Sequence, residues 1–413
     1  MPTGQQSLRS GWVSPDMTSA IRQYLVITGN YWAFTLTDGA LRMLVVLHFH
    51  QLGYSPLEIA LLFIFYEFFG VVTNLVGGYL GARMGLNRTM NLGLFLQIVA
   101  LGMLAVPAAM LTVPWVMAAQ ALSGIAKDLN KMSAKSGIKL LVPNEQQGRL
   151  YKWVAILTGS KNTLKGVGFF LGGVLLMTLE FKGAVIAMAV ALGLVWLASL
   201  FLLRQELGKS KAKPKFTDMF SQSRAINVLS AARLFLFGAR DVWFVVALPV
   251  YLHTVFGWDF WKVGGFLAIW VVGYGFVQTV APRLTGHREG KQAVVLWAVS
   301  LALVPAAIAV GLAAGGSPHF VVVGGLLLFG VLFAINSSLH SYLIVSYARG
   351  DGVSLDVGFY YMSNAAGRLL GTVLSGWIYQ VYGLEACLWI STLLVATASL
   401  LSVMLPERHP APA

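Results

Sequence analysis

The chain has 413 residues, of which 57% are hydrophobic and only 11% are charged. Because a soluble globular domain carries about 25% charged residues, this composition excludes a large soluble core and indicates a membrane protein that crosses the bilayer many times. The formal net charge of +13 would suggest nucleic-acid binding in a soluble protein. Here most of the basic excess lies in short loops and inside apolar segments, so we expect a lipid bilayer, and no nucleic acid, around the chain.

The polar N-terminal stretch, residues 1–22, lacks the charged-then-apolar layout of a cleavable signal peptide, and we expect it to be a cytoplasmic segment. About twelve apolar stretches of spanning length follow it. They run over 23–50, 57–81, 89–110, 113–140, 149–178, 183–204, 225–254, 261–284, 291–314, 319–347, 355–382 and 385–405.

The longest polar break, 204–224, divides these stretches into two sets of six. We therefore expect an N-terminal half over 23–204, a cytoplasmic linker over 205–224, a C-terminal half over 225–405 and a cytoplasmic tail over 406–413. Basic residues gather in alternate loops, so we expect both termini in the cytosol. We also expect the chain to lie in a bacterial inner membrane.

An internal repeat relates the fifth stretch of each half. Ser160 aligns with Ser363, Lys165 with Arg368 and Gly168 with Gly371, at the constant offset 368 − 165 = 203. Parallel six-helix halves with a substrate between them are typical of major facilitator transporters. The sequence thus predicts an all-α, twelve-helix major facilitator fold whose two six-helix halves are related by a pseudo-two-fold axis.

Two glycine-rich motifs resemble signatures of that superfamily. Residues 78–88 (GYLGARMGLNR) resemble its loop signature, but Ala82 stands where an acid is usual. Residues 168–173 (GFFLGG) are similar to its antiporter signature, with Phe169 replacing the proline. The alternative for the first motif is a generic glycine-rich cytoplasmic turn. The alternative for the second is plain helix packing, because small residues let helices approach closely.

Charged side chains inside the apolar stretches are the main functional signal. The cations at this depth are Arg42, Lys127, Lys131, Lys161, Lys165, Arg233, Arg240 and Arg368. The acids are Asp38, Glu67, Asp128 and Asp241. The surplus is 8 − 4 = +4, and each buried charge costs roughly 2.5–3.5 kcal/mol on insertion scales. We therefore predict that the cations bind a small anionic substrate, and that the acids serve proton coupling or charge pairing.

Spacing predicts how some of these charges are arranged. Asp38 and Arg42, one helical turn apart, are expected to pair, as are the neighbours Arg240 and Asp241. Lys127, Lys131 and Lys135 share one helix face, from which Asp128 should point away.

The lysine stripe forms either a basic track to the substrate or, for Lys131 and Lys135, side chains that reach the cytoplasmic interface. Arg368 has no acid in its own helix, and its guanidinium fork suits a phosphate-like oxyanion.

Uncharged polar residues are candidates for lining the same cavity. They are Asn162, Asn336, Tyr361 and Asn364. The only cysteine is Cys387, no Cys/His cluster has zinc spacing, and no nucleotide-binding or catalytic motif occurs. We expect no metal, no cofactor and no enzymatic activity.

Three strings carry a more particular resemblance: 30–42 (NYWAFTLTDGALR), 123–135 (SGIAKDLNKMSAK) and 158–162 (TGSKN). They resemble the organoarsenical efflux permeases of the major facilitator superfamily. The resemblance implies export of 1-arseno-3-phosphoglycerate, functional pairing with a glyceraldehyde-3-phosphate dehydrogenase, and arsenate resistance.

Two alternatives share the charge pattern. A sugar-phosphate or other organophosphate exchanger would need the same cations. A receptor or scaffold without transport would instead pair them internally. We expect a monomer in each case.

Overall fold

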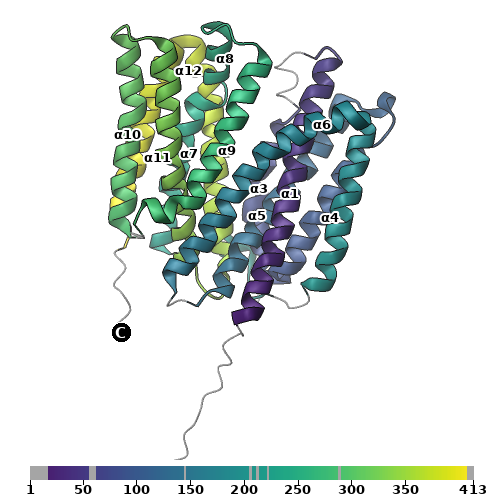
Figure 1. Cartoon of the computed structure of the whole chain (residues 1–413). Helices are drawn as coiled ribbons and strands as arrows, with labels where there is room; N and C mark the ends of the chain where they lie inside the picture. The colour runs from purple at the N-terminus through teal and green to yellow at the C-terminus, as the bar shows by residue number, and fades with distance from the viewer. Residues whose placement is uncertain are drawn as a thin grey trace, which may run out of the picture.

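The computed structural model describes residues 17–54, 62–143, 146–203, 207–210, 214–220, 223–286 and 290–406. Within these ranges the chain is helical and contains no strand (Figure 1). We call the helices before residue 203 the N-terminal group and those after residue 223 the C-terminal group.

The N-terminal group consists of α1 (Met17–Gln51), α3 (Ile64–Met84), α4 (Leu86–Leu104), α5 (Val113–Leu141) and α6 (Gln147–Leu202). The C-terminal group consists of α7 (Arg224–Phe244), α8 (Ala247–Thr254), α9 (Phe260–Leu284), α10 (Lys291–Ala313), α11 (Pro318–Tyr347) and α12 (Val353–Val403). Short 3-10 turns cover Ala108–Met110 and Phe216–Met219.

Helices α6 and α12 are each long enough to cross a bilayer twice, with 56 and 51 residues. Each folds back on itself at one residue with a positive φ, Glu180 (56°) in α6 and Gly383 (78°) in α12. Both bends are visible at the top of Figure 1. The offset between them, 383 − 180 = 203, equals the offset of the sequence repeat.

Eight single spans and these two doubled ones therefore make twelve in the described part of the chain, with α7 and α8 counted as one. This confirms the predicted all-α architecture. Some boundaries were wrong. The expected N-terminal segment 1–22 already enters α1 at Met17, and the expected stretch 89–110 ends as α4 at Leu104. The start of the stretch 57–81 and most of the tail 406–413 lie outside the described residues.

Six helical stretches meet a strict length and hydropathy requirement for spanning, and all begin at Gln147 or later. The early helices α1, α3, α4 and α5 do not, since they carry more polar residues. Helix α5 alone holds four lysines and an aspartate, from Lys127 to Lys139. Lipid cannot solvate such groups, so these helices must turn them toward protein.

Glycines let pairs of helices pack backbone to backbone. A Cβ on Gly168 of α6 would lie 2.7 Å from the carbonyl oxygen of Leu36 in α1. A Cβ on Gly371 of α12 would lie 2.7 Å from the carbonyl oxygen of Gly238 in α7. Gly168 and Gly371 are repeat partners, so the pairs α1–α6 and α7–α12 use the same contact.

Three apolar cores hold the bundle together. One lies inside the N-terminal group around Leu44 and Leu101, and one inside the C-terminal group around Trp243 and Phe329. The third contains side chains of both groups, including Tyr151 and Tyr342, and we call it the shared core. The two groups also meet along α6–α9 and α3–α12.

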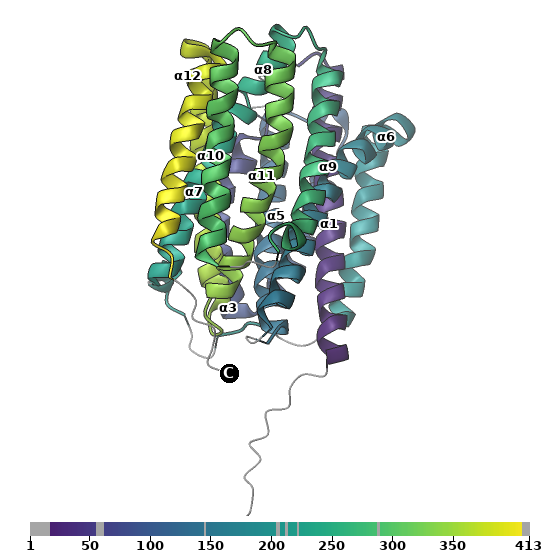
Figure 2. The same ribbon diagram turned by 60° about the vertical axis from the view of Figure 1, so that its left-hand side comes forward.

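The shared core lies at the end of the bundle where α1 begins and α12 ends (Figures 1 and 2). Polar contacts join the groups there. Ser354 Oγ donates to the Gly78 carbonyl (2.8 Å), Lys139 Nζ donates to the Ser346 carbonyl (3.2 Å), and Tyr342 donates to Gln147 (3.1 Å). We call this end the joined end.

Loops at the joined end are also held by specific contacts. Arg349 donates from its backbone and its guanidinium to Asp356 (2.9–3.1 Å), and this hydrogen bonding raises the pKa of Arg349. The α3–α4 turn forms at Gly85, where φ is 98°. Ala82, which replaces the usual acid, accepts a backbone hydrogen bond from Ser210 (2.8 Å). A linker segment therefore contacts this turn through its backbone.

Candidate functional site

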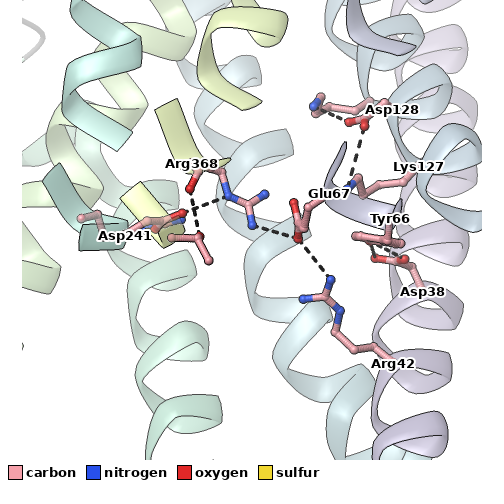
Figure 3. Close-up of polar contacts among 11 residues, drawn as sticks. Asp38, Arg42, Tyr66, Glu67, Lys127, Asp128, Asp241 and Arg368 are labelled. Atoms are coloured by element: carbon pink, nitrogen blue, oxygen red, sulfur yellow. Dashed lines mark hydrogen bonds and ion pairs between the residues drawn. The ribbon is translucent and has the colours of Figure 1, made fainter. Parts of the chain in front are cut away.

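Two carboxylates, one buried and one half-buried, connect helices of both groups through Arg368 (Figure 3). Glu67 of α3 accepts from Arg42 of α1 (3.2 Å) and from Arg368 of α12 (3.1 Å). Arg368 also donates to Asp241 of α7 (3.3 Å), which in turn pairs with Arg240 (2.5 Å). Arg368 is therefore the ionic link between the N-terminal and C-terminal groups among the described residues, and we call this set the central network.

The expected pair of Asp38 and Arg42 is wrong. Asp38 accepts the Tyr66 hydroxyl on both oxygens (2.7 and 3.0 Å), while Arg42 turns to Glu67 and stacks 4.6 Å from the Tyr66 ring. From sequence, the acid one helical turn away was the expected partner of Arg42. In the structure Arg42 pairs with Glu67 instead, because Glu67 lies on a facing helix, where it can contact Arg42 and Arg368 together.

Asp128 does not point away from the lysine stripe, contrary to expectation. Its carboxylate lies 2.6 Å from Lys131 Nζ and 3.9 Å from Lys127 Nζ. The long lysine side chains reach around the helix to a carboxylate that is itself buried. Lys127 also lies 3.8 Å from the centre of the Tyr66 ring, a favourable cation–π position.

The expected pair Arg240–Asp241 is present. Of the eight predicted cations, five thus have a carboxylate partner. The remaining three, Lys161, Lys165 and Arg233, have none among the residues that the structure describes.

Lys161 and Lys165 lie one turn apart in α6, in the middle of its first span, and both are half-buried. Lys161 donates to Asn162 (3.2 Å), which donates in turn to Gln278 of α9. Lys165 makes no hydrogen bond or ion pair within the described part of the chain, yet it interacts electrostatically with Glu67. Two ammonium groups therefore lie beside the central network without counter-ions of their own.

Arg233 of α7 is almost fully buried, 3% exposed, and donates to Asn364 (2.8 Å) and to the Ser337 carbonyl (3.3 Å). Its guanidinium stacks on the Phe237 and Tyr360 rings. Arg233 thus lies apart from the central network, although the sequence grouped it with Arg240 and Arg368.

The predicted lining residues behave differently from one another. Asn162 is half-buried beside Lys161, whereas Asn364 and Tyr361 are buried. Asn336 is fully buried and donates to the carbonyls of Trp297 and Leu332, so in this conformation it bonds backbone.

The central network faces the junction of the two groups and not the lipid. Arg368 and Glu67 each keep 31% of their side-chain surface exposed, yet they pair across the junction. Side chains that contact each other from opposite groups must point toward the space between those groups. The exposed surface therefore belongs to the junction, where a solute from water could reach it.

Sequence analysis missed several residues of this region. Tyr66 stands next to Glu67 and positions Asp38, but an aromatic residue in an apolar stretch gave no signal. Gln278 reaches Asn162 only because α6 and α9 cross at Gly159 and Gly275. Among the described residues, no three His, Cys, Asp or Glu side chains gather as metal ligands would.

Comparison with known proteins places this geometry in context. The family profile described as Major Facilitator Superfamily matches residues 25–356. No curated protein sequence matches the chain.

Solved structures share the fold at low sequence identity. The human organic anion transporter MFSD10 (TETRAN) superposes with a TM-score of 0.71 at 16% identity, covering 94% of this chain and 100% of its own. A bacterial homologue of the iron transporter ferroportin, in an outward-facing state, gives 0.72 at 14%, covering 92% and 98%. The E. coli fucose:proton symporter FucP gives 0.72 at 13%, covering 94% and 100%.

Proposed function

Because this chain belongs to the Major Facilitator Superfamily of membrane transporters, we propose that it exports an organic arsenate or phosphate ester from the cytosol, with 1-arseno-3-phosphoglycerate as the substrate. The observation that carries the proposal is the pair Lys161 and Lys165. Both ammonium groups are half-buried beside the central network, and neither has a carboxylate partner among the described residues. An oxyanion at the junction would supply the missing negative charge.

The chemistry of the substrate suits this arrangement. It carries two tetrahedral oxyanion ends on a three-carbon body, and each end accepts several charge-assisted hydrogen bonds. Arg42, Lys161 and Lys165 would bind one end from the N-terminal group. Arg368 and Arg240 would bind the other, since Arg368 can exchange Glu67 for an oxyanion without moving to another helix.

The three apolar cores support a mechanism of alternating access. The N-terminal and C-terminal groups each have a core of their own, so they can move as units. The shared core and its polar contacts hold one end closed. In the orientation predicted from the basic loops, the joined end faces the cytosol, and substrate enters from the cytosol once that end separates.

The membrane potential favours this direction of transport. Moving a negative charge out of a cell with a negative interior gains about 2.3 kcal/mol per charge per 100 mV. Asp38, Glu67, Asp128 and Asp241 remain candidates for proton coupling. Decay of the ester outside the cell would drive uniport equally well. A glyceraldehyde-3-phosphate dehydrogenase is the proposed functional partner, and a bacterial inner membrane the proposed location.

Uptake into everted vesicles tests the substrate. Vesicles containing the chain are supplied with radiolabelled arsenate, with or without the dehydrogenase, glyceraldehyde 3-phosphate and NAD. We expect accumulation only with the complete mixture, because the enzyme must first make the ester. Accumulation of arsenate without the enzyme would contradict the proposed substrate. Uptake of a radiolabelled organophosphate, with no arsenic accumulated under any condition, would favour the exchanger.

A further inference from the structure

A second group of cations lies closer to the joined end than the central network. Lys135 follows Lys131 along α5, and its ammonium group donates to Thr158 of α6 (2.5 Å). Arg233 approaches from α7 and His340 from α11. We call Lys135, Thr158, Arg233, His340 and Tyr360 the inner cluster.

The inner cluster is buried and positively charged. Lys135 and Arg233 are each 3% exposed, and they repel each other electrostatically. Neither has a carboxylate partner within the described residues; Lys135 contacts a hydroxyl, and Arg233 an amide and a carbonyl oxygen. Two buried cations without a counter-ion are unfavourable unless the structure gains from them in another state.

Hydrogen-bonding groups around these cations are left unused. The Nδ1 atom of His340 and the hydroxyl of Tyr360 are buried and have no hydrogen-bond partner among the described residues. Buried polar groups are normally satisfied, so such groups point to a ligand or a water that they contact in another state. A tyrosine hydroxyl, a lysine and an arginine together form a set of donors for an oxyanion.

The location of the inner cluster connects its accessibility to the opening of the joined end. Tyr360 belongs to the shared core, so it is covered by both groups. Lys139, one turn beyond Lys135, makes the contact with Ser346 that closes this end. Separation of the groups there would expose the inner cluster before the central network. The Tyr361 ring lies beside the inner cluster, with its centre 5.4 Å from Lys135 and 4.7 Å from Lys131.

We propose that Lys135 and Arg233 form a second anion site, which binds the phosphate or arsenate end of an organic ester when the joined end opens and passes it to the central network. This site rests on the proposed function, because it assumes that the chain moves oxyanions. It adds a distinct location, and that location can be probed without any transport measurement.

Labelling of a single thiol tests the site directly. Thr158→Cys is introduced into a Cys387→Ser chain, so that the new thiol lies beside the Lys135 ammonium group. The full chain is reconstituted in phosphatidylcholine vesicles, which contain no anionic lipid headgroup, and treated with a membrane-impermeant maleimide. Glycerol 3-phosphate is the probe, and glycerol is the uncharged control.

We expect labelling from one face only, slowed by saturating glycerol 3-phosphate and unaffected by glycerol. Adding Lys135→Gln or Arg233→Gln should weaken the half-maximal protection roughly tenfold or more, because a charge-assisted contact is lost. Lys135→Arg should retain protection, which separates loss of charge from misfolding. The matched control Lys152→Gln removes an exposed lysine of α6, the helix that carries Thr158, and should change nothing.

Three outcomes would overturn the proposal. A thiol that reacts from neither face would show that the inner cluster never opens. Labelling that glycerol 3-phosphate does not slow would show that no anion binds there. Protection that survives Lys135→Gln and Arg233→Gln would place the anion elsewhere. Protection without transport of an arsenate ester would contradict only the proposed substrate.

Discussion

Arg368 is the residue that connects the two helix groups. Its guanidinium contacts Glu67 of one group and Asp241 of the other, so these contacts depend on the relative position of the groups. The two carboxylates differ sharply in environment, since Asp241 is fully buried and Glu67 is 31% exposed. This difference suggests separate roles: Asp241 holds the arginines in place, and Glu67 gives way to the substrate.

The different burial of Asp241 and Glu67 predicts that neutralising each carboxylate has a different effect on stability. Asp241→Asn should lower the free energy of unfolding by about 3 kcal/mol, because it leaves Arg240 and Arg368 without their buried partner. The matched change Glu67→Gln should cost about 1 kcal/mol or less, because water can reach both of its arginines. Thermal unfolding of the purified variants measures both. Equal losses would contradict the distinction between the two carboxylates.

Much of the residue-level site could not be predicted from sequence. The depth of the charges in apolar stretches identified every member of the central network, and adjacency predicted the Arg240–Asp241 pair. Partners on other helices, such as Glu67 for Arg42, depend on how the helices face one another. Sequence left Lys135 either on a basic track or at the cytoplasmic interface, because spacing cannot show that Thr158 covers it.

Corresponding helices of the two groups share features at a constant offset in residue number. The offset of 203 relates Lys165 to Arg368 in sequence and the Glu180 bend to the Gly383 bend in structure. The repeat was visible in sequence because glycines are required where backbones touch. The bends lie in the breaks predicted near 179–182 and 383–384, where Glu180 and Gly383 have non-helical φ and ψ.

Glycine contacts predict which helix pair is sensitive to a methyl group. Gly371→Ala should destabilise the chain by about 1–3 kcal/mol, because its Cβ would lie 2.7 Å from a backbone oxygen of α7, which cannot move aside. Gly376→Ala, one turn further along α12, meets nothing within 4 Å and should be neutral or slightly stabilising. The thermal unfolding midpoints of the two variants, measured in the same detergent, test this prediction. Similar midpoints would argue against close α7–α12 packing.

The whole molecule is organised as two units that meet in one shared core. Each unit has its own apolar interior, and the charges lie between them. A bilayer protein retains unpaired cations at such a junction only where they gain a partner during function. Lys161 and Lys165 have no carboxylate partner among the described residues, and Arg368 can exchange its half-buried partner Glu67 for a substrate. The central claim is that these two lysines and Arg368 attract an anion.

Transport by charge-neutral variants tests this claim most directly. Lys161→Gln, Lys165→Gln and Arg368→Gln are compared with the exposed-lysine control Lys152→Gln, in everted vesicles supplied with arsenate, the dehydrogenase and its substrates. The account predicts that each junction variant reaches the membrane but loses roughly tenfold or more in uptake, as expected for a lost charge-assisted contact, while the control keeps it. Full uptake by both lysine variants, or equal loss in the control, would contradict the account.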